Sequence, residues 1–165
     1  MRRRGRHCAL QILYQMDMQG RLDGASVTPE VLGEELKRFW ASFEQVDDAE
    51  RDFAERLVRG VAGALEGLDT AISGASHNWK LPRMAKVDRN VLRLASYEIL
   101  HCPDIPKAAS INEALEIAKR FSGGGDSTGF INGILDNIEP AGESAAICET
   151  GTGGSAAAGS EDSMD

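Results

Sequence analysis

Four arginines stand within the first six residues of this chain of 165 residues, and a tyrosine follows at position 14. On a helix, Arg3, His7, Leu10 and Tyr14 form one line, because they are spaced four, three and four residues apart. Arginine side chains neutralise phosphates, and an exposed tyrosine ring stacks on an unpaired base. Single-stranded RNA fits this pattern best, since its bases are free to stack. The alternative is a solvated basic terminus with Tyr14 packed on a neighbouring helix.

A second aromatic candidate lies near the far end of the chain. Phe130 falls at the edge of the apolar stripe of its expected helix, about 90° from the centre of that stripe. An aromatic residue at such an edge is more often part of the core than a platform for a ligand. Lys119, on the outer face of the preceding expected helix, supplies positive charge nearby or is an ordinary solvated lysine.

Patterns for catalysis and metal binding are weak. The glycines at 123–125 are not followed by Gly-Lys-Ser or Gly-Lys-Thr and no strand precedes them, so they do not form a phosphate-binding loop. The histidines at positions 7, 77 and 101 lack the spacing of metal ligands. Cys8, Cys102 and Cys148 have no CxxC spacing and are expected to be single thiols of a cytoplasmic protein. We expect no metal, no cofactor and no catalysis.

One carboxylate falls among apolar residues. Glu98 lies on the same helical stripe as Val91, Leu94 and Ala95, and is therefore expected to be buried. A buried carboxylate can act as an acid or base. No second carboxylate or nucleophile pairs with Glu98 by spacing, so a hydrogen bond or an arginine partner is the favoured interpretation.

Charge is distributed unevenly along the chain. The net charge is −8, but residues 141–165 contain five acidic residues and no Lys or Arg, which leaves −3 for residues 1–140. Residues 141–165 are also rich in Gly, Ala and Ser, and such a composition buries too little apolar surface to fold. We expect a disordered acidic tail at 141–165 after one helical domain at 1–140. No signal peptide or membrane-spanning run is predicted.

Apolar residues in the body recur with helical periodicity, while the β-branched alternation of strands is missing. The predicted helices are about Arg3 to Met18, stopped by Gly20; one starting at Thr28-Pro29; one from Asp47 or Asp48 through Ile72; Met84 to His101; one starting at Ser110 with Glu113 as a capping box; and one capped by Asp126 or Ser127 and stopped by Pro140. The fold class is all-α. Glycines at positions 60, 63 and 67 weaken the third helix or let a neighbouring helix approach closely.

Five segments in this order and spacing resemble the NusB family across nearly all of residues 2–138. They are RRRGRHCALQILYQMD, FAERLVRGV, MAKVDRNVLRLASYEIL, DIPKAASINEALEIAKRF and FINGILDNI. The resemblance implies a fold of two small helical bundles with six to seven helices in total. It also implies binding to boxA sequences in ribosomal-RNA leader transcripts, a heterodimer with NusE (a small-subunit ribosomal protein) and membership of an antitermination complex on RNA polymerase.

The resemblance also assigns residues. It places Arg2, Arg3, Arg4, Arg6, Tyr14, Lys119 and Phe130 at RNA-contacting positions, with Arg89 as a weaker basic candidate. Asp126 matches a position near the surface shared by RNA and partner. His7 departs from the family pattern.

Two other functions remain open at this stage. A NusB-like domain also occurs fused to ribosomal-RNA cytosine methyltransferases, but this chain is too short for the catalytic domain and has no glycine-rich cofactor motif after a strand. The chain can also be read as an interaction module that forms a homodimer without RNA contact.

Overall fold

The computed structural model describes residues 2–43, 46–77, 80–123 and 126–140; the predicted tail at 141–165 lies outside these residues. The described part is all-helical, as predicted. Its elements are α1 (Arg2–Met18), α2 (Pro29–Ser42), α3 (Asp48–Gly63), α4 (Leu65–Ala75), the 3-10 turn η1 (Leu81–Arg83), α5 (Lys86–His101), α6 (Lys107–Phe121) and α7 (Ser127–Asp136).

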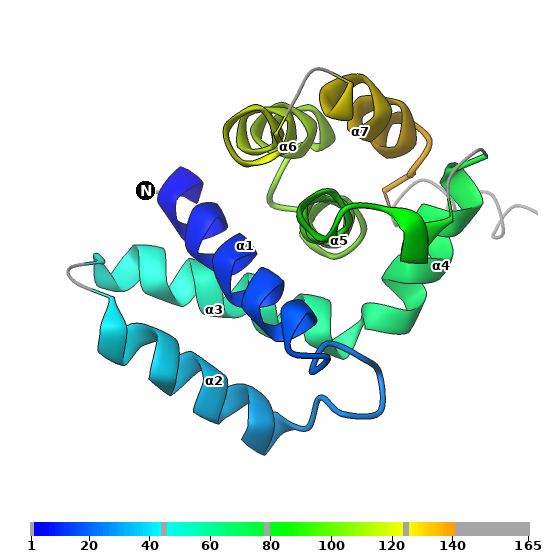
Figure 1. Ribbon diagram of the computed structural model, residues 1–165. Coiled ribbons are helices and arrows are strands. Elements are labelled where there is room, and N and C mark those ends of the chain that lie inside the picture. The colour runs from blue at the N-terminus through cyan, green and yellow to red at the C-terminus, as the bar shows by residue number, and fades with distance from the viewer. Residues whose placement is uncertain (1, 44–45, 78–79, 124–125, 141–165) are drawn as a thin grey trace, which may run out of the picture.

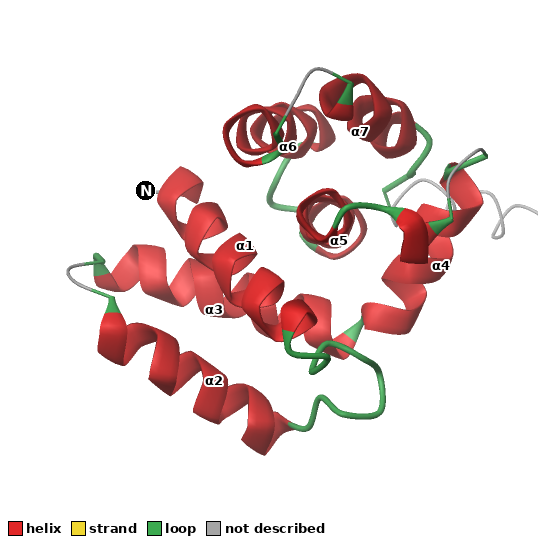
Figure 2. Ribbon diagram, in the orientation of Figure 1, coloured by secondary structure: helices red, strands yellow, loops and turns green. Residues whose placement is uncertain are grey.

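The helices form two groups that share an interface (Figure 1). Helices α1, α2 and α3 lie together on one side, and α4, α6 and α7 surround α5 on the other; loops join them throughout (Figure 2). Helix α5 contacts α1, α3, α4, α6 and α7, and ten of its residues are buried. The mostly apolar sequence of α5 predicts this central place, because only a surrounded helix can bury side chains most of the way round.

Helix α1 ends where the sequence predicts. Gly20 has a φ of 65°, a left-handed conformation that glycine adopts without strain. The Gly20 amide donates to the carbonyl of Asp17, and the Arg21 amide donates to that of Met16. These two bonds satisfy carbonyls at the end of the helix in a Schellman motif. The predicted core stripe of α1 is buried, but Leu10 is buried as well, at 3 % exposure.

The long third helix of the prediction is two helices. Helix α3 ends at Gly63, Ala64 makes the turn, and α4 begins at Leu65. Leu65, Leu68 and Ile72 continue the apolar stripe because both helices face the same core. The helical periodicity of the sequence therefore continues across the break between α3 and α4 and does not reveal it.

Helix α6 begins three residues before the predicted Ser110. Pro106 takes the N-cap position, and its ring fixes a φ of −61°. The predicted capping box is wrong because Ser110 points inward, where its hydroxyl donates to the buried carboxylate of Glu98.

Two glycines allow helices to approach closely. A Cβ at Gly5 of α1 would lie 2.9 Å from the Glu50 carbonyl oxygen and 2.9 Å from the Phe53 ring of α3. A Cβ at Gly60 of α3 would overlap the ring of Tyr97 on α5. Gly63 and Gly67 meet nothing within 4 Å, so the predicted close approach is confirmed only at Gly60 among the three.

We predict that Gly60→Ala lowers the free energy of unfolding by about 1–3 kcal/mol, because the added methyl group displaces the Tyr97 ring. Gly67→Ala is the matched control within a helix. There the Cβ enters open space, and alanine favours the helix by about 0.5–1 kcal/mol. Urea denaturation of both variants measures the difference, and equal stability would contradict the proposed close packing.

Candidate nucleic-acid interface

Every basic residue that the sequence marked as RNA-contacting has a carboxylate partner in the folded chain. The pairs are Arg2 with Asp104, Arg3 with Glu113, Arg4 with Glu50, Arg6 with Glu98, Arg89 with Asp17 and Lys119 with Glu116. Burial divides these pairs into two classes. Those of Arg6 and Arg89 are largely inside the protein, while Arg2, Arg3, Arg4 and Lys119 keep more than half of their side-chain surface exposed.

Arg6 is a core residue. Its guanidinium donates to both carboxylate oxygens of Glu98 at 2.6 and 3.0 Å, and the two side chains are 6 % and 1 % exposed. The prediction of a structural arginine partner for Glu98 is confirmed. The expectation that Arg6 contacts RNA is corrected, because a phosphate cannot reach a guanidinium that is enclosed and already paired.

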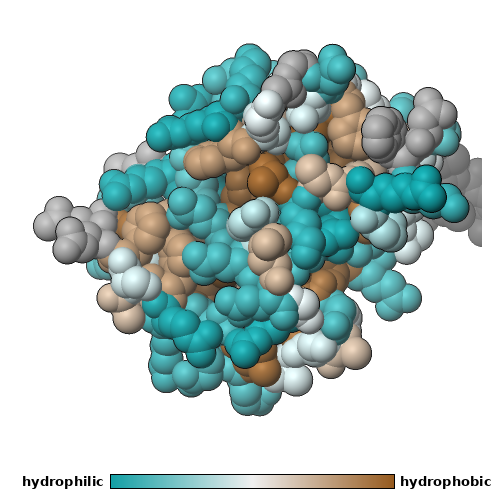
Figure 3. Space-filling model, viewed as in Figure 1, coloured by the Kyte–Doolittle hydropathy of each residue, from teal (hydrophilic) through white to brown (hydrophobic). Residues whose placement is uncertain are grey.

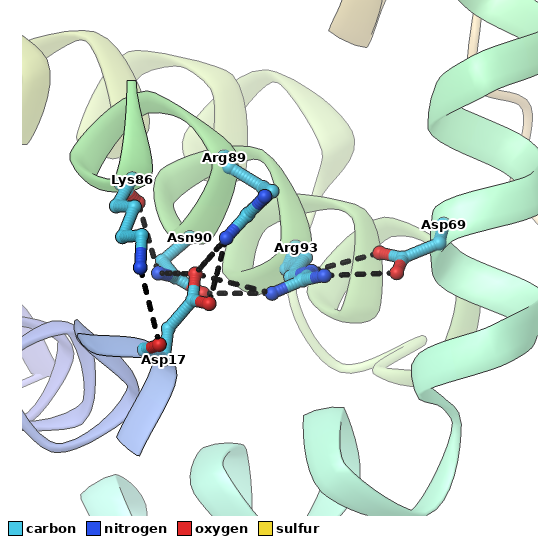
Figure 4. A network of polar contacts seen from close by, with 6 residues as sticks. All are labelled: Asp17, Asp69, Lys86, Arg89, Asn90 and Arg93. Atoms are coloured by element: carbon cyan, nitrogen blue, oxygen red, sulfur yellow. Dashed lines mark hydrogen bonds and ion pairs between the residues drawn. The ribbon is translucent and has the colours of Figure 1, made fainter. Parts of the chain in front are cut away.

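Arg89 is held in a second inner network, which joins α1, α4 and α5 (Figure 4). Its guanidinium donates to Asp17 at 2.6 Å, and the amide of Asn90 donates to the same carboxylate at 2.9 Å. Arg93 links Asp17, at 3.5 Å, to Asp69 of α4, at 2.8 Å. Arg89 is therefore a bridge between helices in this structure, which corrects its assignment as a contact for RNA.

The carboxylate of Asp17 stays ionised in this setting. Burial by itself raises the pKa of Asp17, but hydrogen bonds from Arg89 and Asn90, with the charges of Arg89 and Arg93, outweigh it. The result is a pKa below the ordinary value of an aspartate. Asp17 therefore anchors the end of α1 to α5 as a charged group.

The exposed arginines at the start of α1 are paired on the surface. Arg3 donates two bonds to Glu113 of α6, at 2.8 and 3.0 Å, and this contact lowers the pKa of Glu113 below its usual range. Arg2 lies 3.4 Å from Asp104, and Arg4 lies 3.9 Å from Glu50. Ion pairs at the surface contribute about 0–1 kcal/mol, so a phosphate can replace the carboxylate at small cost at Arg2 and Arg3, whereas the partner of Arg4, Glu50, is buried.

An aromatic contact that the sequence did not predict joins α1 to α6. The rings of His7 and Phe121 meet edge to face at 5.5 Å, and the Arg120 guanidinium lies 5.6 Å from the centre of the Phe121 ring. Phe121 is 37 % exposed, because it is the last residue of its helix. The pKa of His7 is lowered by burial and by the charges of Arg120 and Arg3.

Phe130 is half-buried, as its edge position predicts, and lines a cavity. A cavity of about 350 Å³ is lined by Arg83, Met84, Ala85, Asp88, Asp126, Ser127 and Phe130. The Asp88 carboxylate accepts hydrogen bonds from the hydroxyls of Ser122 and Ser127, on either side of the glycine loop. Asp88 therefore fixes the start of α7, which carries Phe130 and the exposed Asp126. Sequence analysis did not single out Asp88.

The line predicted on α1 is only partly at the surface. Arg3 is exposed, His7 and Tyr14 are half-buried, and Leu10 belongs to the core. Tyr14 lines a groove between α1 and α2. The face seen in Figure 3 is largely hydrophilic, with patches of hydrophobic residues between the hydrophilic ones.

Within the described residues, no three His, Cys, Asp or Glu side chains are grouped so as to hold a metal ion. No helix there is long and apolar enough to cross a bilayer.

These features define an all-helical protein built on a central helix, with paired arginines and aromatic rings at its surface. The sequence profile of the NusB family matches residues 3–140, and the chain belongs to this family. Two similar proteins are named transcription antitermination protein NusB. That of Anaeromyxobacter dehalogenans strain 2CP-1 is 49 % identical over 138 residues, which is 83 % of this chain and 89 % of the relative. That of Geobacter sulfurreducens is 49 % identical over 137 residues, which is 83 % of this chain and 92 % of the relative.

Solved structures agree with the family. NusB of T. maritima superposes with a TM-score of 0.72 at 36 % identity, covering 89 % of this chain and 97 % of the other. A chain from a complex of antitermination factors NusB and NusE with double-stranded RNA has a TM-score of 0.69 at 23 % identity, covering 83 % of this chain and 94 % of the other. The predicted family and the predicted two-bundle fold are confirmed.

We predict that Arg6→Ala lowers the free energy of unfolding by about 3–5 kcal/mol, because it leaves the Glu98 carboxylate buried without a countercharge. Arg2→Ala removes an arginine from the same helix and is the control, with an expected change below about 1 kcal/mol, because its partner Asp104 is 44 % exposed. Thermal unfolding followed by circular dichroism measures both. A similar loss in the two variants would show that the buried pair has no special role in stability.

Proposed function

We propose that this protein is a transcription antitermination factor that binds boxA RNA of ribosomal-RNA leader transcripts together with NusE. It joins an antitermination complex on RNA polymerase in the cytoplasm and acts by assembly, without catalysis. The observation that carries the proposal is the exposed basic end of α1, where Arg2, Arg3 and Arg4 remain at the surface near His7 and Phe121. The family of this protein and the names of its relatives support the same function.

RNA binding on this surface is an exchange of partners. Arg3 leaves Glu113 for a phosphate, and the released carboxylate is hydrated at the surface, where its side chain is 20 % exposed. The exchange is favoured because the arginine displaces counterions from the RNA phosphates, whereas the pair within the protein releases none. The net charge of −8 is no obstacle, because the contact is local and few charges carry it.

Asp126, Phe130 and Lys119 form the second half of the proposed surface. Asp126 and Phe130 flank the cavity beside α5, and Lys119 lies on the outer face of α6, 3.0 Å from Glu116. The hollow and its exposed carboxylate suit a protein partner beside the RNA. We assign this partner as NusE, since a related fold is solved with NusE and double-stranded RNA.

The absence of catalysis is part of the proposal. Glu98, the carboxylate that looked most like an acid or base, is occupied by Arg6 and Ser110. The division at residue 140 is also a proposal: residues 1–140 form the binding domain and 141–165 form a separate acidic tail.

We predict that Arg3→Ala combined with Tyr14→Ala weakens the binding of single-stranded boxA RNA while the helical circular dichroism stays unchanged. Each removed phosphate contact lowers the slope of log affinity against log salt by about 0.7 for a single strand. A lost stacked base weakens binding by about 1–3 kcal/mol. Fluorescence anisotropy at several salt concentrations, with and without NusE, measures both the affinity and its salt slope. Unchanged affinity at low salt would overturn the proposed function.

We predict that Glu113→Gln strengthens RNA binding a few-fold, because Arg3 no longer leaves a charged partner. The salt slope is expected to stay the same, because Arg3 contacts a phosphate in both proteins. Glu116→Gln, one helical turn away on α6 and paired with Lys119, is the comparison for a general loss of negative charge. If both variants bind equally well, the specific Arg3–Glu113 exchange is wrong.

A further inference from the structure

A groove of about 490 Å³ runs between the outer face of α1 and one side of α2. Its lining consists of Gln11, Tyr14, Gln15 and Gln19 from α1, and of Glu35, Arg38, Phe39, Ser42 and Phe43 from α2. None of the residues marked by their resemblance to the family lies in it except Tyr14. The groove therefore extends the candidate surface from α1 onto a helix that sequence analysis left without a role.

The floor of the groove is a row of amides. Gln11, Gln15 and Gln19 are spaced four residues apart, so their side chains follow one another along a single face of α1. Within the described residues these three side chains make no hydrogen bond. Each amide offers two donor hydrogens and an acceptor oxygen, the groups needed to read the edge of a base.

Aromatic rings stand on both sides of this row. Tyr14 lies on the α1 side, half-buried, and its hydroxyl has no hydrogen-bond partner in the described part of the chain. On the α2 side, Phe39 and Phe43 stack on each other with their ring centres 4.9 Å apart. Rings beside unpaired amides suit a flat ligand that has both a stacking face and a polar edge.

The charges of the groove do not oppose an anionic ligand, because its carboxylate is neutralised by arginines. Its one carboxylate, Glu35, is 7 % exposed and accepts bonds from both Arg21 and Arg38. Within the lining Arg38 offsets Glu35, and Arg21, which lies outside the lining, adds a second positive charge on the same carboxylate. The Arg38 side chain is 64 % exposed at the rim, where it can turn toward a phosphate.

We propose that this groove receives unstacked bases of single-stranded RNA, read by Gln11 and Gln15 and stacked by Tyr14. Tyr14 belongs both to the groove and to the Arg3 line, so a strand held by its phosphates at the start of α1 continues into the groove. This inference rests on the proposed function and adds to it a place where sequence is read. A second protein would instead need a broad apolar surface, and the row of amides does not provide one.

The test uses the full chain with Gln11→Ala and Gln15→Ala combined. Alanine favours an exposed helix, so folding is preserved. The probes are a single-stranded boxA RNA and a shuffled RNA of the same length and composition. We expect boxA binding to weaken about tenfold, because two amide contacts are lost. Binding of the shuffled RNA and the salt slope stay unchanged, since no charge is removed. Thr70→Ala, an exposed neutral change on α4, is the matched control.

The outcomes separate the groove from the rest of the surface. If Arg3→Ala with Tyr14→Ala weakens binding and the glutamine variant binds boxA as the wild type does, the groove inference fails while the proposed function stands. Equal weakening for boxA and shuffled RNA would also overturn base reading. If the glutamine variant changes the oligomeric state in sedimentation but not RNA affinity, the groove is a protein interface and the inference is wrong. If neither variant affects RNA binding, the proposed function is wrong, and the groove inference, which rests on it, is wrong as well.

Discussion

The buried ion pair between Arg6 and Glu98 is the contact on which the arrangement of the two helix groups depends. Glu98 lies on the central helix α5, Arg6 brings in α1, and the hydroxyl of Ser110 brings in α6. A buried charge must be matched in place and number, because an unpaired partner is strongly destabilising. The pair therefore restricts how α1 can lie against α5, and the same restriction positions the exposed arginines that precede Arg6.

A second charged network repeats this constraint at the other end of α1. Asp17 gathers Arg89, Asn90 and Arg93 of α5, and Arg93 continues to Asp69 of α4 (Figure 4). Because these contacts hold α1 against α5 near both of its ends, the exposed face of α1 has a fixed orientation. The surface proposed for RNA is thus preorganised, which reduces the ordering entropy that binding would otherwise oppose.

The surface proposed for RNA binding is held by ion pairs that are weak because solvent reaches them. Arg3 and Glu113 meet at the surface, where solvent screens their attraction, while Arg6 and Glu98 meet where it does not. Chemically identical pairs therefore serve opposite purposes on one helix. Asp88 accepts hydrogen bonds from two serine hydroxyls and so positions the start of α7 and the cavity beside Phe130.

Sequence alone determined the all-helical class, the central place of α5, the stop at Gly20 and the burial of Glu98, because periodicity and capping are local properties. It did not show the break between α3 and α4 or the start of α6. The sequence also marked the basic start of α1. Only the tertiary structure decided which of these paired cations are exposed and which are buried. Arg3 and Arg6 are three residues apart, yet one faces solvent and the other a buried carboxylate 92 residues away. Periodicity gives a direction around a helix but does not say which neighbouring helix faces it at that level. For that reason Leu10, on the predicted line with Arg3 and Tyr14, is in fact in the core.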